Sequence, residues 1–284
     1  MIQIRRAKME DAQECGRICY EAFRTISMQH NFPPDIPVPN MAVGLLTQMF
    51  SHPEFYCVVA EEGGKILGSN CLDERTPIAG VGPITIDPAV QNQQTGRALM
   101  KAIMQRAAEK KFAGVRLVQA AFHNRSMALY AKLGFAVREP LACMQGPALR
   151  AVLPGYTARR AETRDLDACN ALCRRVHGHE RGGELRDAMA GGVAVVAERD
   201  ATIHAYATPL AFFGHAVATD NAAMQALIAA AEAFGGPGIL VPTRNTELFH
   251  WCLRSGLQVV QPMTLMSVGL YNEPAGSFLP SILF

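Results

Sequence analysis

The sequence predicts a mixed α/β fold made of two similar units in tandem, and three observations lead to this prediction. The length of 284 residues suits two domains of about 140 residues each. Segments with the alternation of a β-strand are interleaved with segments that have the apolar spacing of a helix. The opening pattern also returns at a constant offset of 154 residues, which pairs Arg5, Asp11 and Cys15 with Arg159, Asp165 and Cys169.

The first unit opens with a strand, two helices and a strand hairpin. These elements are expected at Ile2–Arg5, Asp11–Phe23, Met41–Phe50, Phe55–Ala60 and Lys65–Asp73. The two helices are separated by an irregular segment, Thr25–Pro39, because its four prolines forbid regular structure. A pair of edge strands within Val137–Met144 is expected to close the unit.

The stretch Val81–Phe135 has the clearest chemical pattern. A strand, Val81–Ile86, leads through Asp87-Pro88 into a glutamine-rich turn and then a helix at about Gly96–Lys111. A helix that begins soon after a strand leaves its first N–H groups free to bind an anion, and the small residues Gly96 and Ala98 leave room for one. A pyrophosphate would suit this place; the alternative is a strand-to-helix turn that binds nothing.

Three segments in this stretch resemble the acyl-CoA-binding core of the GNAT superfamily of N-acyltransferases. The turn of that family reads Arg/Gln-x-x-Gly-x-Gly/Ala, and Gln93, Gly96 and Ala98 occupy its defining positions. The strand end Ile84–Ile86 resembles the strand whose backbone pairs with the pantetheine arm, and Asn124–Phe135 resembles the family's Asn…Ala…Tyr…Leu-Gly-Phe segment. The resemblance implies two tandem GNAT-like domains, each a mostly antiparallel mixed sheet flanked by helices.

The resemblance also implies which residues contact acetyl-CoA, the acyl-donor substrate. They are Ile84, Thr85, Ile86, Gln91, Gln93, Gln94, Thr95, Gly96, Arg97, Ala98, Asn124, Ser126 and Tyr130. Members of the family often have arginine at the position of Gln93 and glycine at that of Gln94. The turn is therefore less positive and less permissive than usual, and affinity for acyl-CoA could be lower.

Acyl transfer from a thioester to an amine needs a base, a donor for the oxyanion and an acid for the leaving thiolate. By resemblance, backbone N–H groups of Ile84–Ile86 face the thioester oxygen and Tyr130 faces the sulfur as general acid. A phenol has a pKa of about 10 and a thiol one of about 8.5, so this proton transfer needs little tuning. Asn124 is expected to bond the pantetheine arm or the strand backbone, or to cap a helix.

The general base is left open by the sequence. Some members of the family carry a glutamate on the strand before the acyl-CoA contact, but here the positions read Ile78-Ala79-Gly80. Asp73, Glu74, His123 and a chain of waters remain as candidates. In the GNAT fold the segment between the first two helices walls the acceptor pocket, so the candidates for contact with the acceptor are Met28, His30, Phe32 and Asp35.

The second unit resembles a degenerate copy of the first. Residues 1–148 are predicted to be the catalytic acyl-CoA-binding domain and residues 156–284 a GNAT-like domain that is not catalytic. The counterpart of the anion turn, Ala218–Met224, has no glycine and carries an acid that would repel a phosphate. Cys252 stands where the first unit has Tyr130. The helices of the second unit are expected at Asp167–Val176, Glu184–Ala190 and Ala222–Phe234, and its strands at Val193–Glu198 and Ile203–Ala207.

Composition limits the function classes. The net charge of +2 is too small to imply nucleic acid or an anionic membrane as partner, and no apolar run or leader indicates a membrane or secretory protein, so a cytoplasmic location is expected. The eight cysteines fall mostly within apolar patterns, which favours reduced core thiols. The His177–Arg181 segment is expected to line an inter-domain cleft and no metal is expected. The apolar tail Tyr271–Phe284 should pack against a domain or a second subunit in a homodimer.

The sequence leaves three functional hypotheses. The first is an N-acetyltransferase that transfers an acetyl group from acetyl-CoA to a primary amine by direct attack. The second is a sensor or regulatory protein that binds acyl-CoA without catalysis. The third keeps catalysis but assigns the acceptor to a protein N-terminus or lysine. The identity of the acceptor cannot be read from loop sequence.

Overall fold

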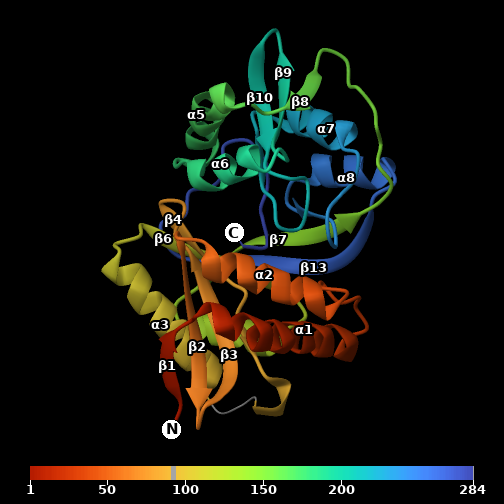
Figure 1. The fold of residues 1–284 in the computed structure, drawn as a ribbon. Coiled ribbons are helices and arrows are strands. Elements are labelled where there is room, and N and C mark those ends of the chain that lie inside the picture. Colours follow the sequence, from red (N-terminus) through yellow and green to blue (C-terminus); the bar gives the residue numbers. More distant parts are fainter. Residues whose placement is uncertain (91–93, 284) are drawn as a thin grey trace.

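The computed structural model describes residues 1–90 and 94–283, which form a mixed α/β fold in two halves (Figure 1). The first half, with the N-terminus, is the lower part of Figure 1, and the second half is the upper part. Mixed sheets flanked by helices were predicted for both halves, and this prediction is confirmed.

The first half contains seven strands and four α-helices in the part of the chain that the structure describes. The strands are β1 (Gln3–Arg6), β2 (Phe55–Glu62), β3 (Lys65–Asp73), β4 (Ile78–Val81), β5 (Thr85–Ile86), β6 (Gly114–Ala120) and β7 (Ala136–Gln145). The helices are α1 (Ala12–Gln29), α2 (Pro39–Ser51), α3 (Thr95–Glu109) and α4 (Asn124–Lys132). Helices cover both faces of the sheet: Cys57 and Val59 of β2 pack with α1 and α2, whereas the alternate residues Val58 and Ala60 pack with α3.

The second half has a similar order with seven strands and four α-helices among the described residues, but three strands instead of four lie between its second and third helices, and β14 is added at its end. The strands are β8 (Thr157–Arg160), β9 (Val195–Arg199), β10 (Thr202–Ala207), β11 (Ala216–Ala218), β12 (Ile239–Pro242), β13 (Gln258–Gly269) and β14 (Ser277–Leu279). The helices are α5 (Leu166–His177), α6 (Gly182–Ala190), α7 (Asn221–Ala230) and α8 (Thr246–Arg254). Again both faces are covered: Val196 of β9 packs with α5 and α6, and Ala197 packs with α7.

The two halves share strands. Strand β13 of the second half lies between β6 and β7 of the first half and pairs antiparallel with both. Strand β7 in turn pairs with β12 of the second half, so the sheet order runs β1-β2-β3-β4-β6-β13-β7-β12. In Figure 1, β7 and β13 lie together where the two halves meet. The predicted pair of edge strands at Val137–Met144 is therefore wrong, because this segment is one strand flanked on both sides by strands of the second half.

Three predicted boundaries also differ from the structure. The strand expected at Val81–Ile86 is two strands, since the chain changes direction at Gly82-Pro83 between β4 and β5. Helix α1 continues past Phe23 to Gln29, so the irregular segment begins later than expected. Helix α7 ends at Ala230 instead of Phe234, where the backbone of Ala231 becomes extended. The other helices and strands lie close to their predicted positions.

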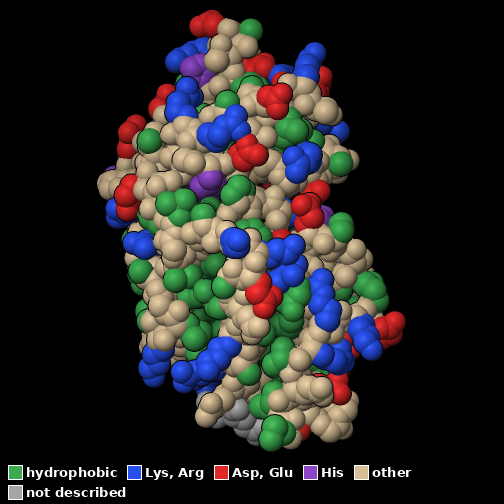
Figure 2. Space-filling model, turned by 90° about the vertical axis from the view of Figure 1, so that its left-hand side faces the viewer, with side chains coloured by type: hydrophobic (Ala, Val, Ile, Leu, Met, Phe, Trp, Pro, Cys, Tyr) green, Lys and Arg blue, Asp and Glu red, His purple; other side chains and the backbone are tan. Residues whose placement is uncertain are grey.

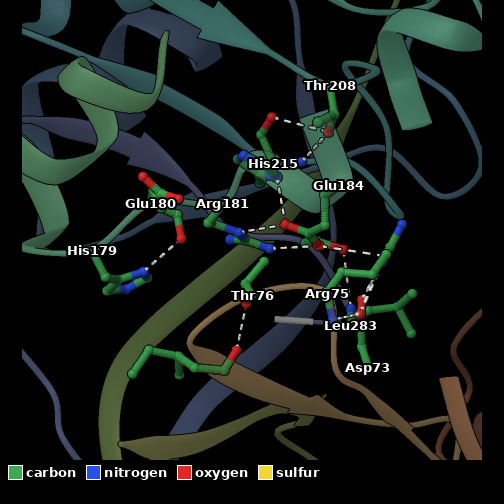
Figure 3. Close-up of polar contacts among 12 residues, drawn as sticks. Asp73, Arg75, Thr76, His179, Glu180, Arg181, Glu184, Thr208, His215 and Leu283 are labelled. Carbon is green, nitrogen blue, oxygen red and sulfur yellow. Dashed lines mark hydrogen bonds and ion pairs between the residues drawn. The ribbon is translucent and has the colours of Figure 1, made fainter. Parts of the chain in front are cut away.

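Buried ion pairs hold the halves together beside the shared sheet (Figure 3). Arg75, in the loop between β3 and β4, donates to Asp73 of β3 and to Asp187 of α6. Glu184 of α6 accepts two hydrogen bonds from Arg181, at 2.6 and 2.9 Å, and lies 3.7 Å from Arg75. Burial raises the pKa of Glu184, but Arg181 and His215 beside it hold the net pKa well below its usual value. The carboxylate is therefore ionised at the joint between the halves.

The remaining expectations about the whole chain concern thiols and membranes. All eight cysteines are buried and none is bridged, as predicted for core thiols. Within residues 1–90 and 94–283, no helix is long and apolar enough to span a membrane. The predicted packing of the tail is confirmed in part, because Ser277–Leu279 forms β14 and pairs with β11.

Candidate active site

A cavity of about 240 Å³ lies in the first half and is closed by residues from both halves. On the face shown in Figure 2, hydrophobic side chains gather over the lower, first half of the molecule, and Lys and Arg side chains border them. Residues lining the cavity include Phe23, Asp35, Ile36, Leu45, Ile84, Thr85, Ile86, Leu117, Gln119, Ala120, His123, Arg125, Ser126, Leu129, Tyr130, Phe212, Phe213, Met263, Ile282 and Leu283.

The cavity exists because two strands diverge. Strand β4 pairs with β6 in parallel only at Ile78–Gly80, after which Gly82 and Pro83 turn the chain away. Strand β5 then pairs with β3 instead, which leaves a gap between β5 and β6. Because Asp87 donates to Leu67 and the hydrogen-bond direction alternates along a strand, the N–H of Ile86 points away from β3 and toward this gap. The gap therefore offers a main-chain donor of the kind predicted at Ile84–Ile86.

Helix α3 begins beside this gap. Gln94, at its N-terminal end, has a left-handed backbone with φ of 63°, and the N–H of Ala98 already donates to Gln94. The N–H groups of Thr95, Gly96 and Arg97 precede the first intrahelical bond and have no acceptor within the helix. A Cβ on Gly96 would lie 3.2 Å from Ile86, so this glycine lets the helix approach β5.

The residues predicted to contact acyl-CoA near this turn differ in their position and exposure. Gln91 and Gln93 lie outside the described residues. Arg97 is exposed in the first turn of α3, whereas Thr95 is buried. Ile84, Thr85 and Ile86 line the cavity, and the hydroxyl of Thr85 is buried with no hydrogen-bond partner among the described residues. A buried hydroxyl of this kind is available to a polar ligand.

Helix α4 and the residue before it bring three polar side chains to the cavity wall. Ser126 lies 2.8 Å from Nδ1 of His123, and Tyr130 is buried behind them. Burial raises the pKa of Tyr130 to about 12, although its hydrogen bond to Ser126 works in the opposite direction. Burial also lowers the pKa of His123 to about 4, with a contribution from Arg125. At neutral pH the site therefore holds a protonated phenol and a neutral imidazole.

Asn124 is exposed at the start of α4 and is not among the residues lining the cavity. His123 precedes the helix without a side-chain capping bond. The predicted contact of Asn124 with the pantetheine arm stays a prediction.

The candidates for the general base differ in whether they line the cavity. Asp73 is bound to Arg75 and Glu74 to Arg106, and neither lines the cavity. His123 does line it. The structure adds Asp35, whose pKa burial raises to about 6 and whose carboxylate accepts a hydrogen bond from Gln261 of β13.

Of the four predicted acceptor contacts, the structure brings only Asp35 to the cavity. Met28 is exposed, and the rings of His30 and Phe32 pack on Phe122 instead. The sequence did not identify the residues that the second half contributes, namely Phe212, Phe213, Met263, Ile282 and Leu283. Only the unusual apolar character of the tail indicated that part of it had to be covered.

The corresponding region of the second half is arranged differently. Strand β14 pairs with β11 and also packs against β12, so it lies between the two strands that correspond to β4 and β6. At the start of α7, the carboxylate of Asp220 accepts the N–H of Ala223 at 2.9 Å. Cys252 is fully buried in the core of this half.

Metal-ligating residue types do not gather into a site. Across residues 1–90 and 94–283, no group of three or more His, Cys, Asp or Glu side chains is placed to hold a metal ion. His177 and His179 are buried with their ring centroids 5.8 Å apart, and His179 lies 3.3 Å from a guanidinium nitrogen of Arg116 on β6. These histidines therefore lie at the joint between the halves, next to a cation.

Comparison with known proteins agrees with this geometry. Residues 20–135 match the acetyltransferase (GNAT) family. Similar structures include a protein from Pyrococcus horikoshii that is described as an acetyltransferase, with a TM-score of 0.75, 16% identity, and coverage of 97% of this chain and 94% of that one. A GCN5-related N-acetyltransferase from Sphaerobacter thermophilus has a TM-score of 0.63 and 13% identity, with 96% of each chain covered. No curated protein matches the sequence.

A tandem GNAT protein from the clavulanic acid biosynthesis pathway has the same arrangement over almost its full length. The TM-score is 0.56 at 14% identity, with 95% of this chain and 98% of that chain covered. The fold is thus that of a tandem GNAT protein, and residues 20–135, in the first half, match the acetyltransferase (GNAT) family. This class transfers an acyl group from acyl-CoA to an amine.

Proposed function

We propose that the protein transfers an acetyl group from acetyl-CoA to a primary amine by direct attack. The working site is the gap between β5 and β6 in the domain at residues 1–148, and the domain at residues 156–284 binds no acyl-CoA. The observation that carries the proposal is the open gap itself, because the corresponding position of the second half is occupied by β14.

The residues at this gap fit an acyl-CoA. The free N–H groups at the start of α3 would bind the pyrophosphate, aided by the charge of Arg97. The pantetheine arm would lie along β5, with the buried hydroxyl of Thr85 and the backbone of Ile84–Ile86 as its polar partners. Ser126 and Tyr130 would then face the thioester end from α4.

Two groups of the chain would act on the reacting atoms. The N–H of Ile86 donates to the thioester oxygen as negative charge develops there. The hydroxyl of Tyr130 donates to the sulfur as the C–S bond breaks. Because its raised pKa keeps the phenol protonated, Tyr130 is a donor throughout the neutral range. The same raised pKa opposes full transfer to a thiolate whose conjugate acid has a pKa of about 8.5, so the hydrogen bond itself supplies much of the stabilisation.

A calorimetric titration and a rate assay together test this proposal. Acetyl-CoA should bind with one molecule per chain, and free CoA should be released when primary amines are added. Binding without release of CoA for any amine would instead support a sensor. Two molecules bound per chain would show that the second half retains a site.

A further inference from the structure

The part of the cavity beyond the thioester is built by both halves, and its chemistry limits the acceptor. One wall comes from the first half, with Phe23, Ile36 and Leu45, and the other from the second half, with Phe212, Met263 and Leu283. These six residues are apolar. We call this region the acceptor chamber, and its role as the place of the acceptor rests on the proposed acyl transfer.

Asp35 is the one carboxylate among the described residues that line the cavity. No Lys, Arg or His forms an ion pair with it in the described part of the chain, and its hydrogen-bond partner is the neutral amide of Gln261 at 2.5 Å. The titratable groups near it are the thiols of Cys19 on α1 and Cys143 on β7. A carboxylate that faces an apolar cavity without a cation is favourable only when a ligand supplies the positive charge.

Two buried amides, Gln119 in the cavity wall and Gln261 beside Asp35, have unused hydrogen-bonding groups. The side chain of Gln119 on β6 is 6% exposed, and neither its oxygen nor its nitrogen has a partner among the described residues. The oxygen of Gln261 is also unpaired within that part of the chain, although this side chain is 1% exposed. Buried amides are nearly always bonded, so these groups are suited to a polar ligand. The oxygen of Gln119 and the carboxylate of Asp35 both line the cavity and can accept hydrogen bonds from an ammonium group.

The positive charge at the cavity comes from helix α4. Among the described lining residues, the side chain with a permanent positive charge is Arg125, which lies with Ser126 in the first turn of α4. His123 is neutral at working pH because burial lowers its pKa to about 4. A carboxylate on an acceptor whose amine binds Asp35 would therefore lie beside a carboxylate that forms no ion pair with a described Lys, Arg or His.

We propose that the acceptor is a compact, apolar primary amine without a carboxylate, and that Asp35 binds its ammonium group and acts as the general base. Asp35 takes one proton from the ammonium and later releases it to solvent. The amine nitrogen then forms a bond to the acyl carbon while the C–S bond breaks. The second nitrogen proton replaces the one that Tyr130 gives to sulfur. Gln261 is a positioning residue, since it holds Asp35 from the second half.

The experiment compares acceptors that differ by one group. CoA release is measured with 2-phenylethylamine, with L-phenylalanine, which adds a carboxylate beside the amine, and with a lysine peptide. We expect kcat/KM for 2-phenylethylamine to exceed that for L-phenylalanine by at least about 100-fold. Equal use of L-phenylalanine, or use of the peptide alone, would overturn the inference and leave the proposed acyl transfer intact. Failure of acetyl-CoA to bind would overturn both.

The Asp35→Asn variant tests the role of the carboxylate. Parent kcat/KM should rise with pH and level off above about 6, because the base acts only when deprotonated. The variant should lose about 100-fold in kcat/KM and lose this pH dependence, while its acetyl-CoA affinity and melting temperature do not fall. The matched control is Glu10→Gln, an exposed acid outside the cavity, which should leave the rate unchanged. A parent-like rate and pH profile in Asp35→Asn would overturn the assignment.

Discussion

The two halves of the chain place the same elements around the same gap, and they differ in what occupies it. In the first half, β5 turns away from β6 and leaves a cavity. In the second half, β14 fills the corresponding gap and pairs with β11. The difference is made by the chain's own tail, which supplies to β11 the main-chain partners that a pantetheine arm would supply in the first half.

The helix that comes after the gap shows the same contrast. The first N–H groups of α3 have no acceptor within the helix, whereas Asp220 caps α7 by accepting the N–H of Ala223. A carboxylate in that place both satisfies the helix and repels a phosphate. If the second half binds no acyl-CoA, as proposed, then it has kept the fold and lost the ligand because groups of the same chain satisfy those that the ligand would bind.

The largest effect is expected from filling the first gap as β14 fills the second. Ala120 lines the cavity at the end of β6, so Ala120→Trp should abolish detectable binding of acetyl-CoA in a calorimetric titration. Val137→Trp places the same side chain on β7 at a residue that is 53% exposed and should bind normally. Normal binding by Ala120→Trp would place the acyl-CoA site elsewhere.

The next effect concerns the joint between the halves. Glu184→Gln removes the buried carboxylate that accepts from Arg181 and should lower the free energy of unfolding by about 3–5 kcal/mol. Glu14→Gln breaks an exposed pair with Arg17 and should cost less than about 1 kcal/mol. Because the pKa of Glu184 is depressed in the folded protein, its contribution is present above pH about 4.3 and is lost on acidification. Denaturant titrations at several pH values measure the free energy of unfolding of both variants and its pH dependence. An equal loss of stability in the two variants would contradict this account.

The third prediction compares Tyr130 of the first half with Cys252, the residue at the corresponding position of the second half. Tyr130→Phe should lower kcat by about 100-fold and leave acetyl-CoA affinity almost unchanged, because the hydroxyl acts on the departing sulfur. Cys252→Ala, at the corresponding position of the second half, should keep the parent kcat. The measurement is the rate of CoA release at saturating amine. An unchanged rate in Tyr130→Phe would remove the residue from the mechanism.

The smallest effect is expected from introducing a negative charge in the first turn of α3 or of α7. Arg97→Glu in α3 should weaken acetyl-CoA binding by about tenfold, equivalent to about 1.4 kcal/mol, and the loss should shrink at high salt. Ala222→Glu puts the same charge in the first turn of α7, where we expect no change in affinity. Titrations of both variants with acetyl-CoA at two salt concentrations measure the two losses of affinity. A larger loss in Ala222→Glu would reverse the assignment of the two halves.

Local sequence patterns predicted the helices and strands better than they predicted which strands lie side by side in the sheet. Alternation identified Lys65–Asp73 as a strand with the bounds that the structure has, and the repeat identified two similar units. Periodicity carries no information about partners, so the insertion of β13 between β6 and β7 was missed. The same holds for the site. Asp35 was predicted as a contact because it lies in the proline-rich segment, but its bond to Gln261 joins residues 226 positions apart, which no local signal reports.

The most direct test of the contrast between the halves is hydrogen–deuterium exchange with and without acetyl-CoA. The account predicts slower exchange over residues 81–98 and 114–130, which include the gap, the start of α3 and α4. It predicts no change over residues 216–230, where β14 and Asp220 already occupy the equivalent places. Protection of residues 216–230, or protection of neither region at saturating acetyl-CoA, would contradict it.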